Sequence, residues 1–360
     1  MNELAKTDEL FNKDDMRAID ALHRAHFIAF APYVWEASKL LREKGILRIV
    51  FNHKDGISFD DIFKEINISH YGLRILLEAG LGIGLLYAQD NLYFLTKTGY
   101  FFINNESVHV NYKFMKDVCF DGVPSLEESI KKSRPEGLKN FGPWSTVYEG
   151  LSKLPGEVKD SWFGFDHFYS DNTFDVILPM IFKDKPKNIL DIGGNTGKWA
   201  LKCLEYDKDV RIGVVDLEGQ INVAKKTIAD AGFSDRVDFY TIDMLSDAEL
   251  PQGYDVIWMS QFLDCFSDDQ IVSILQKCHE SSDEHTRVYI NETFWDLQRF
   301  ETSAFILQMT SLYFTTIANG TSQMYDSKVF LRFTEEAGFK LVDKSELIGH
   351  GHTLLMLNKK

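Results

Sequence analysis

The stretch Asn188-Ile189-Leu190-Asp191-Ile192-Gly193-Gly194-Asn195-Thr196-Gly197 decides the fold of this chain. A short apolar run ends at an aspartate, a turn rich in glycine follows, and residues 198–206 have a helical pattern. Glycine permits a sharp turn and lets a ligand approach the backbone closely. A plain strand-to-helix turn would also explain these glycines, so the motif needs support from its surroundings.

Two further acidic residues stand at matching places in the chain. Asp216 closes the apolar run 210–215, and Asp243 closes the run 237–242. Parallel strands have their carboxyl ends at one edge of a sheet, so these acids are expected to line the crevice where open α/β sheets bind ligands. The turn lacks the G-x-G-x-x-G spacing of a dinucleotide site and the Gly-Lys-Ser/Thr of a P-loop.

Length and composition are those of a globular enzyme. The chain has 360 residues and 44% hydrophobic residues, enough for one large domain and a smaller one. A net charge of −15 argues against nucleic acid or anionic lipid as a partner. The first residues lack the apolar core of a signal peptide, no apolar run is long enough to span a membrane, and the four cysteines show no paired or zinc-finger spacing. We therefore expect a cytoplasmic protein with reduced thiols.

The N-terminal third has a winged-helix pattern. Apolar spacing predicts a helix over residues 30–47 that ends near Gly45, a second after Ser58 with Asp61 as its capping partner, and a third after Ser69, followed by a hairpin over 84–95. Such domains often read DNA, but the helix after Ser69 carries only Arg74, whereas DNA readers cluster Lys and Arg there. The apolar helix 27–41 instead favours a homodimer interface.

The rest of the chain predicts an α/β fold. From about residue 161, strands and helices alternate, which indicates a parallel sheet covered on both faces. Further strands are predicted over 254–260 and 287–291, and an antiparallel pair over 339–342 and 352–357 completes seven strands. Helices are predicted after Ser267, over 298–317 and after Asp326. The predicted domains are a winged-helix dimerisation domain over 1–107, a helical connector over 108–160 and a Rossmann-like domain over 161–360.

Five segments together resemble one enzyme family. They are the turn 191–197, Val215-Asp216-Leu217, the segment 235–237 with Asp243-Met244, the run 262–269, and the helix 165–173. In order and spacing they are similar to the dimeric S-adenosylmethionine-dependent O-methyltransferases of small molecules, which include plant caffeic-acid-type and bacterial natural-product enzymes. The resemblance covers nearly the whole chain and implies S-adenosylmethionine as the cofactor.

The resemblance assigns cofactor contacts to nine residues. Asp216 would bind both ribose hydroxyls, Asp243 the adenine amino group, and Asp191 the amino group of the methionine portion. As alternatives, Asp191 would only brace the loop, Asp243 would cap the turn after a strand, and Thr173 would be a surface threonine. Asn195 stands where relatives have a third glycine, which suggests that it tolerates a left-handed backbone. The expected set is Asp191, Gly193, Gly194, Asp216, Leu217, Asp243, Met244, Thr173 and Ser260.

The implied acceptor is a small, aromatic or polyketide-like hydroxyl compound. Phe165 and Tyr169 share a helical face that borders the acceptor in relatives, and Phe262 is expected beside them, although aromatics at this spacing also occur in plain cores. Transfer to nitrogen or carbon would keep every cofactor motif, some relatives bind the cofactor without methylating, and a DNA-binding regulator is a further alternative. His350 and His352 have too few companions to form a metal site.

The chain departs from the family at its catalytic base. Relatives carry a His in a His-Asp-Trp run, whereas this chain reads Asp264-Cys265-Phe266, so Asp264 takes the place of that His. A carboxylate with a pKa near 4 is a poor base toward a phenol, but burial would raise its pKa. Asp264 is therefore a base of raised pKa, a group that only orients the acceptor, or an inert remnant. Glu292 matches a family acid that supports the base, and both acids are assigned to catalysis.

Overall fold

The computed structural model describes residues 10–360. Contacts divide the described chain into two compact units, residues 13–113 and residues 114–360 with 10–12. Residues 114–160 thus belong to the larger unit, and the domain boundaries proposed at residues 107 and 160 stay predictions. None of the helices in the described range has both the length and the apolar character that a membrane crossing requires.

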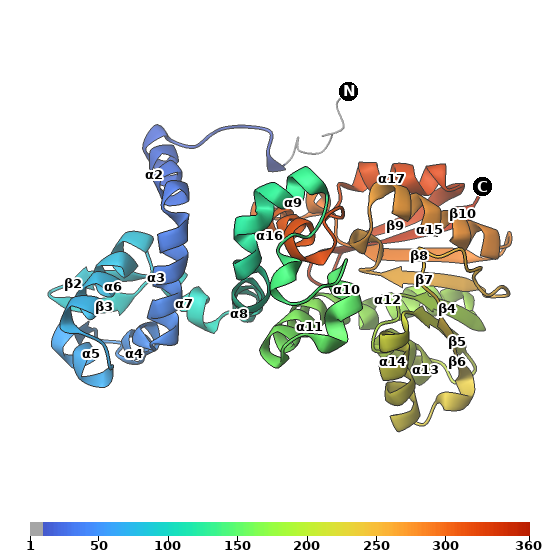
Figure 1. The fold of residues 1–360 in the computed structure, drawn as a ribbon, viewed down its shortest axis with the longest axis horizontal. Helices are drawn as coiled ribbons and strands as arrows, with labels where there is room; N and C mark the ends of the chain where they lie inside the picture. The colour runs from blue at the N-terminus through green and yellow to red at the C-terminus, as the bar shows by residue number, and fades with distance from the viewer. Residues whose placement is uncertain (1–9) are drawn as a thin grey trace. The chain divides into compact units, whose positions relative to one another are not determined.

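The smaller unit has the predicted winged-helix arrangement (Figure 1). Strands β1, β3 and β2 form a small antiparallel sheet in that order. Ser58 and Ser69 cap α5 and α6 as predicted, because their hydroxyls accept backbone N–H bonds from Asp61 and Gly72. The elements are α2 (Ala18–Ala29), α3 (Ala31–Glu43), α4 (Ile46–Asn52), β1 (Ile57–Ser58), α5 (Phe59–Glu65), α6 (His70–Ile83), β2 (Leu86–Gln89), β3 (Leu92–Leu95), α7 (Lys97–Asn104) and α8 (Glu106–Phe114).

The prediction of one continuous helix over residues 27–41 is wrong. Helix α2 ends at Ala29 and α3 begins at Ala31, because Pro32 lacks a backbone N–H and its ring would clash with the carbonyl of Ile28 in an unbroken helix. The apolar exposure that motivated the prediction is nevertheless present. No residue of α2 is buried, and five large side chains of this region are more than half exposed: Ile19, Leu22, Ile28, Phe30 and Tyr33.

The larger unit is built on the predicted seven-stranded sheet. Its order is β6-β5-β4-β7-β8-β10-β9, with the first five strands parallel and β10 antiparallel to both β8 and β9, so the predicted C-terminal pair is confirmed. Strand β6 ends at Thr241, and Asp243 therefore lies in the loop beyond it. The strands are β4 (Asn188–Ile192), β5 (Arg211–Asp216), β6 (Val237–Thr241), β7 (Val256–Ser260), β8 (Arg287–Glu292), β9 (Phe339–Ile348) and β10 (His352–Lys359).

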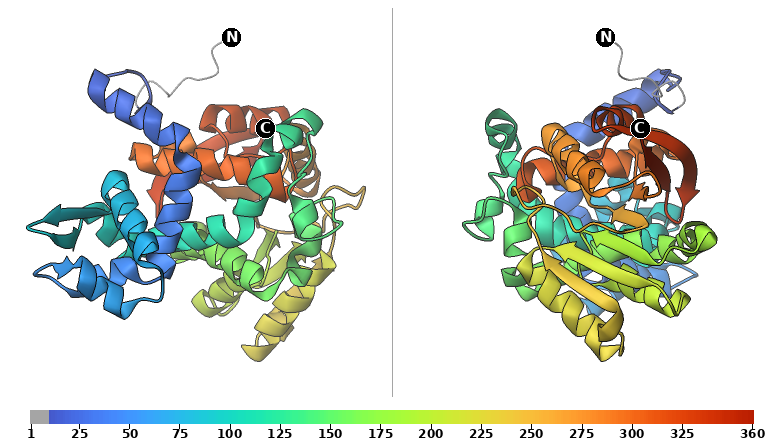
Figure 2. Two further views of the ribbon diagram at one scale, coloured as in Figure 1. Left: turned by 60° about the vertical axis from the view of Figure 1, so that its left-hand side comes forward. Right: turned by 90° about the vertical axis from the view of Figure 1, so that its right-hand side faces the viewer.

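Helices cover both faces of this sheet (Figures 1 and 2). Alternate strand residues point to opposite faces, so Leu190 joins the core under α15 and α17, whereas Ile189 joins the core under α12, α13 and α14. The predicted capping box of Ser267 and Gln270 opens α15, and Asp326 caps α17. The bounds are α12 (Phe174–Ile181), α13 (Lys198–Tyr206), α14 (Glu218–Asp230), α15 (Asp268–Ser281) and α17 (Ser327–Glu336).

A third core lies among the remaining helices of the larger unit. These are α9 (Leu126–Lys132), α10 (Val147–Gly150), α11 (Gly156–Ser170) and α16 (Glu301–Tyr313). Helix α16 is shorter than the predicted 298–317, and it continues as a π-helical turn over Phe314–Ala318. Its residues Tyr313 and Phe314 pack with Phe114, and all three also line a cavity at the carboxyl ends of the parallel strands.

Candidate functional site

The turn between β4 and α13 has the backbone that its sequence predicts. Asn195 adopts the expected left-handed conformation with φ of 49°, and Gly197 has φ of 80° just before α13. At Gly193, with φ of 73°, an added Cβ would lie 2.3 Å from the ring of Phe262. Glycine is thus required at position 193 by the packing of Phe262 as well as by the turn itself.

The carboxylate of Asp216 holds this turn in place. Its Oδ2 accepts a hydrogen bond from the backbone N–H of Asn195 at 2.8 Å, and its Oδ1 accepts one from Leu217 at 2.7 Å. Burial raises the pKa of Asp216 to about 6, although these two hydrogen bonds act in the opposite direction. The acid predicted at the end of β5 therefore lies at the crevice and organises the loop beside it.

A cavity of about 340 Å³ lies at the carboxyl ends of β4, β5 and β7. Its wall contains Asp216, Leu217, Asp243 and Met244. Met244 is buried, while Asp243 is exposed and accepts a hydrogen bond from the backbone N–H of Leu245 at 2.9 Å. The wall also contains eight aromatic residues: Phe114, Tyr148, Trp162, Phe165, Phe262, Phe266, Tyr313 and Phe314.

A second, smaller cavity of about 70 Å³ adjoins the first. The two share Asp166, Gly193, Asn195 and Gln261 as wall residues. Gly194, Ser260 and Asp191 of the predicted cofactor set line the smaller one. The cavities are therefore two compartments of one site.

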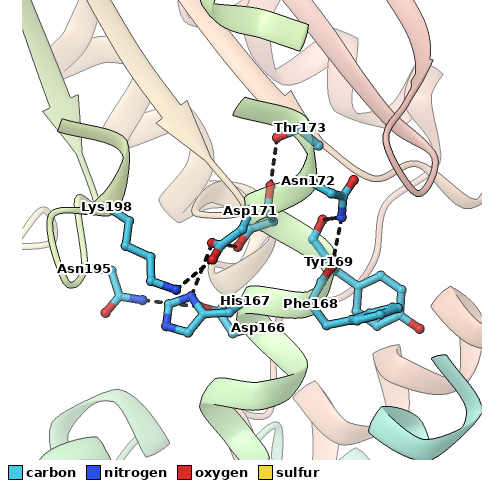
Figure 3. A network of polar contacts seen from close by, with 10 residues as sticks. Asp166, His167, Phe168, Tyr169, Asp171, Asn172, Thr173, Asn195 and Lys198 are labelled. Carbon is cyan, nitrogen blue, oxygen red and sulfur yellow. Dashed lines mark hydrogen bonds and ion pairs between the residues drawn. The ribbon is translucent and has the colours of Figure 1, made fainter. Parts of the chain in front are cut away.

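A polar network borders the smaller cavity (Figure 3). Lys198 Nζ donates to Asp171 Oδ2 at 2.7 Å, and His167 Nδ1 lies 3.4 Å from Asp171 Oδ1. Burial alone would raise the pKa of Asp171, but the hydrogen bonds from His167 and Lys198 lower it to about 2. Asp166, in the same network, accepts a hydrogen bond from Asn195 Nδ2 at 3.3 Å.

Asp191 is a buried acid without a counter-charge. It is 2% exposed, and its Oδ2 finds no hydrogen-bond partner among residues 10–360. Burial, together with the nearby charge of Asp216, raises the pKa of Asp191 to about 8. A ligand that brings a positive group to this carboxylate would relieve its desolvation.

Asp264 lies on the wall of the larger cavity, and Cys265 and Asp166 influence its carboxyl group. It is 5% exposed, and the thiol of Cys265 donates to its Oδ1 at 3.5 Å. Burial raises the pKa of Asp264 to about 7, and the charge of Asp166 acts in the same direction. A carboxyl group with this pKa is half ionised near neutral pH, the range in which a general base works best.

Glu292 lies behind Asp264 and does not line either cavity. It is 1% exposed, and its Oε1 accepts hydrogen bonds from the backbone N–H groups of Phe262 at 3.0 Å and Leu263 at 2.9 Å. These bonds fix the short helical turn that carries Asp264. The geometry thus gives Glu292 a positioning function, with Asp264 as the acid that can reach a ligand.

The other predicted residues divide between the wall and the interior. Phe165 and Phe262 line the larger cavity. Tyr169 lines neither cavity and packs on Phe165 with ring centroids 5.0 Å apart. Thr173 is fully buried, and its Oγ1 donates to the carbonyl of Ser170 at 2.9 Å and accepts from Asn291 at 3.3 Å. The predicted cofactor contact of Thr173 and acceptor contact of Tyr169 therefore lack a cavity surface in this structure.

The sequence analysis did not predict several residues of the cavity wall. Trp162 precedes Phe165 by one helical turn, a spacing that could have indicated it, and its Nε1 donates to the hydroxyl of Tyr313 at 2.7 Å. Tyr148 comes from the short helix α10, and no pattern in the sequence links it to Tyr313 on α16. Asp166 lies inside a quoted motif, yet nothing in its spacing distinguished it from a surface acid.

Comparison with known proteins identifies both parts of the chain. Residues 23–93 match the Dimerisation2-like domain, and residues 174–340 match the O-methyltransferase domain. This chain is an S-adenosylmethionine-dependent methyltransferase. The methyltransferase is 21% identical to the L-tyrosine C(3)-methyltransferase of Streptomyces lavendulae over 296 residues, which are 81% of this chain and 79% of the relative.

Solved structures share the fold of the methyltransferase. The S-adenosylmethionine-dependent methyltransferase SibL has a TM-score of 0.68 at 21% identity and covers 92% of this chain and 98% of its own. The O-methyltransferase NcsB1 of neocarzinostatin biosynthesis, in complex with S-adenosylmethionine and 2-hydroxy-5-methyl naphthoic acid, has a TM-score of 0.65 at 18% identity and covers 91% and 96%. The predicted fold and enzyme class are confirmed.

Replacing Asp191 with Asn should stabilise the ligand-free methyltransferase at alkaline pH. The folded state retains a proton on Asp191 up to about pH 8, whereas an unfolded aspartate loses it near pH 4, so wild-type stability falls as the pH rises between these values. We expect the free energy of unfolding at pH 8 to be about 1–3 kcal/mol larger for D191N than for wild type, and this difference to shrink toward pH 5. Urea denaturation at both pH values measures it.

Asp209, an exposed acid in the loop before β5, provides the matched control. D209N removes the same charge and should change stability equally at both pH values. A D191N variant that is less stable than wild type at pH 8 would show that Asp191 is ionised and paired.

Proposed function

We propose that this methyltransferase transfers a methyl group to a hydroxyl of a small aromatic molecule. The observation that carries the proposal is the position of Asp264, a buried carboxyl on the wall of the larger cavity, which Asp216, Met244 and the aromatic residues also line. The rings of Phe165, Trp162 and Tyr313 on the cavity wall offer apolar surface to an aromatic acceptor. A carboxylate base can take the proton of an ionisable hydroxyl on the acceptor's ring.

The residues of both compartments fit S-adenosylmethionine. Asp216 would accept bonds from the ribose hydroxyls, and the buried Met244 offers an apolar surface to the adenine, with Asp243 and Leu217 beside it. In the smaller compartment the unpartnered Oδ2 of Asp191 suits the amino group of the methionine portion. Lys198 and His167 border the same compartment and suit its carboxylate. Opposite charges of the ligand thus meet opposite charges of the protein.

In the proposed reaction Asp264 takes the proton of the acceptor hydroxyl. When bound, S-adenosylmethionine would supply a methyl group on a positively charged sulfur; the methyl carbon would bond to the acceptor oxygen as its bond to sulfur breaks, and the neutral thioether S-adenosylhomocysteine would be the leaving group. The aromatic walls hold the acceptor ring, and Glu292 fixes the turn that carries Asp264 through its bonds to Phe262 and Leu263. Orientation of this kind contributes roughly 7–11 kcal/mol, more than the roughly 3–5 kcal/mol of a general base.

A second candidate is transfer to a ring carbon beside a phenol. It is favoured by the similarity to the L-tyrosine C(3)-methyltransferase, which extends over most of this chain. A phenolate delivers its charge to the neighbouring ring carbon as well as to the oxygen, so Asp264 would serve both reactions by removing the same proton. Product analysis by mass spectrometry and NMR after a screen of phenols separates the two.

Loss of the Asp216 carboxylate should weaken cofactor binding. We expect D216A to bind S-adenosylhomocysteine about 10–100-fold more weakly than wild type, because charge-assisted hydrogen bonds to hydroxyls and the brace on Asn195 are lost together. Titration calorimetry measures the affinity, and D235A, at an exposed aspartate outside the cavity, is the control. Undiminished binding by D216A would overturn the cofactor assignment.

Replacement of Asp264 should slow turnover and leave the cofactor in place. For D264A we expect kcat about 10²-fold lower on an acceptor found by the screen, with affinity for S-adenosylhomocysteine nearly unchanged. Wild-type kcat should rise with pH through about 7, as the carboxyl ionises, and the variant should lose this limb. D264H, which restores the base of the family, should recover part of the rate.

The exposed Asp269 in the first turn of α15 is the matched control for that experiment. D269A changes the same charge near the same loop and should keep the wild-type rate and pH profile. If D264A turned over at the wild-type rate, Asp264 would have no part in the reaction.

We also propose that the methyltransferase is a homodimer joined through its N-terminal domain. Ile28 and Tyr33, on α2 and α3, are 67% and 77% exposed, and the Dimerisation2-like match covers both. Light scattering should give the dimer mass for wild type and the monomer mass for I28D/Y33D at micromolar concentration. V223D, at an exposed valine on α14, should stay dimeric. A monomeric wild type would contradict the proposal.

A further inference from the structure

The charges around the acceptor compartment are of one sign. Within residues 10–360, the walls of the larger cavity include Glu149, Asp166, Asp216, Asp243 and Asp264, and no Lys, Arg or His. Asp216 and Asp243 belong to the cofactor side, Asp166 lines both cavities, and Glu149 and Asp264 line the larger one only, so Glu149, Asp166 and Asp264 are the acids that an acceptor in the larger cavity can meet. The basic residues Lys198 and His167 line only the smaller cavity. A bound acceptor therefore meets acidic groups and no positive side chain.

The three acids, Glu149, Asp166 and Asp264, differ in solvent exposure. Asp264 is 5% exposed, the side chain of Asp166 is 24% exposed, and Glu149 is exposed at the rim. The contacts of Asp166 are its bond from Asn195 Nδ2 at 3.3 Å and the ring of His167 at 3.8 Å, neither of them a close ion pair. Its carboxylate thus retains capacity for a cation that enters from the cavity.

The aromatic wall favours the same kind of ligand. The rings of Trp162, Phe165 and Tyr148 lie on the wall together with Asp166, and aromatic faces attract cations. A carboxylate on the acceptor would find neither a basic side chain here nor a favourable ring face.

We infer that the acceptor carries a basic amine in addition to its aromatic hydroxyl, and that a free carboxylate on the acceptor weakens its binding. The hydroxyl is placed at Asp264, and the ammonium group is held by Asp166 and Glu149 against the aromatic wall. This selectivity rests on the proposed function for the location of the acceptor. The amine is a recognition element, and the transferred methyl group goes to the other end of the molecule.

Four phenols of one shape test this inference by binding alone. They are tyramine, which is cationic, 4-ethylphenol, which is neutral, tyrosine, which has both charges, and 3-(4-hydroxyphenyl)propionate, which is anionic. Calorimetric titration into wild-type dimer saturated with S-adenosylhomocysteine should give the order of affinity tyramine, then 4-ethylphenol and tyrosine, then the propionate. We expect tyramine to bind about 100-fold more tightly than the propionate.

Variants that remove the charges of Glu149 and Asp166 test whether these two acids cause the preference for a cationic phenol. In E149Q/D166N the affinity for tyramine should fall at least tenfold, while that for 4-ethylphenol changes less than about threefold, a selective loss that a merely misfolded wall would not show. D160N, at an exposed acid of the same helix α11, removes a charge outside the cavity and should keep the wild-type order. D166N and E149Q alone divide the contribution between the two acids.

The outcomes separate this inference from the proposed function. Equal or tighter binding of the propionate than of tyramine by wild type would overturn the inference, whether or not phenols are methylated. The expected order of binding without methyl transfer to any phenol would uphold the inference and refute the proposed reaction. Unchanged tyramine affinity in E149Q/D166N would overturn the assignment of the ammonium group to these acids.

Discussion

Desolvation of carboxylates at one edge of the sheet is the constraint on which the site depends. Asp191 is the last but one residue of β4, Asp216 ends β5, Glu292 ends β8, and Asp264 follows β7. The parallel topology thus gathers four acids at neighbouring strand ends. Backbone N–H groups compensate Asp216 and Glu292, whereas Asp191 Oδ2 has no partner within residues 10–360. In the proposed function, the positively charged amino group of the cofactor would compensate this carboxylate.

The two compartments differ in the charges that their walls present to a ligand. Lys198 and His167 surround Asp171 beside the smaller cavity, where their charges hold the pKa of Asp171 to about 2, and the larger cavity has acids only. A ligand that spans both would place its carboxylate near Lys198 and His167 in the smaller compartment and present no anionic group to the larger one. S-adenosylmethionine has this distribution of charge, which connects the electrostatics of the site with the enzyme class.

The sequence predicted the features that depend on neighbouring residues. The strand ends at Asp191 and Asp216, the left-handed Asn195, the caps at Ser58, Ser69, Ser267 and Asp326 and the C-terminal antiparallel pair all follow from local rules of backbone conformation. The helix predicted from residue 30 begins close to the start of α3 at Ala31, whereas the continuous helix predicted over 27–41 was wrong because it disregarded Pro32. The sequence did not predict the cavity wall, since Tyr148, Trp162 and Tyr313 come from three helices that only tertiary packing brings together.

In the proposed reaction, Asp264 changes the base of the site without a change in the scaffold that carries it. The turn that carries it is held from behind by Glu292, through backbone N–H groups of Phe262 and Leu263 that any residue at position 264 would leave intact. The side chain at 264 is thus free to differ from the family His, provided that burial adjusts its pKa. Burial beside Asp166 raises the pKa of Asp264 to about 7, close to that of an ordinary histidine, so a carboxyl group here can take over the proton transfer for which relatives use an imidazole.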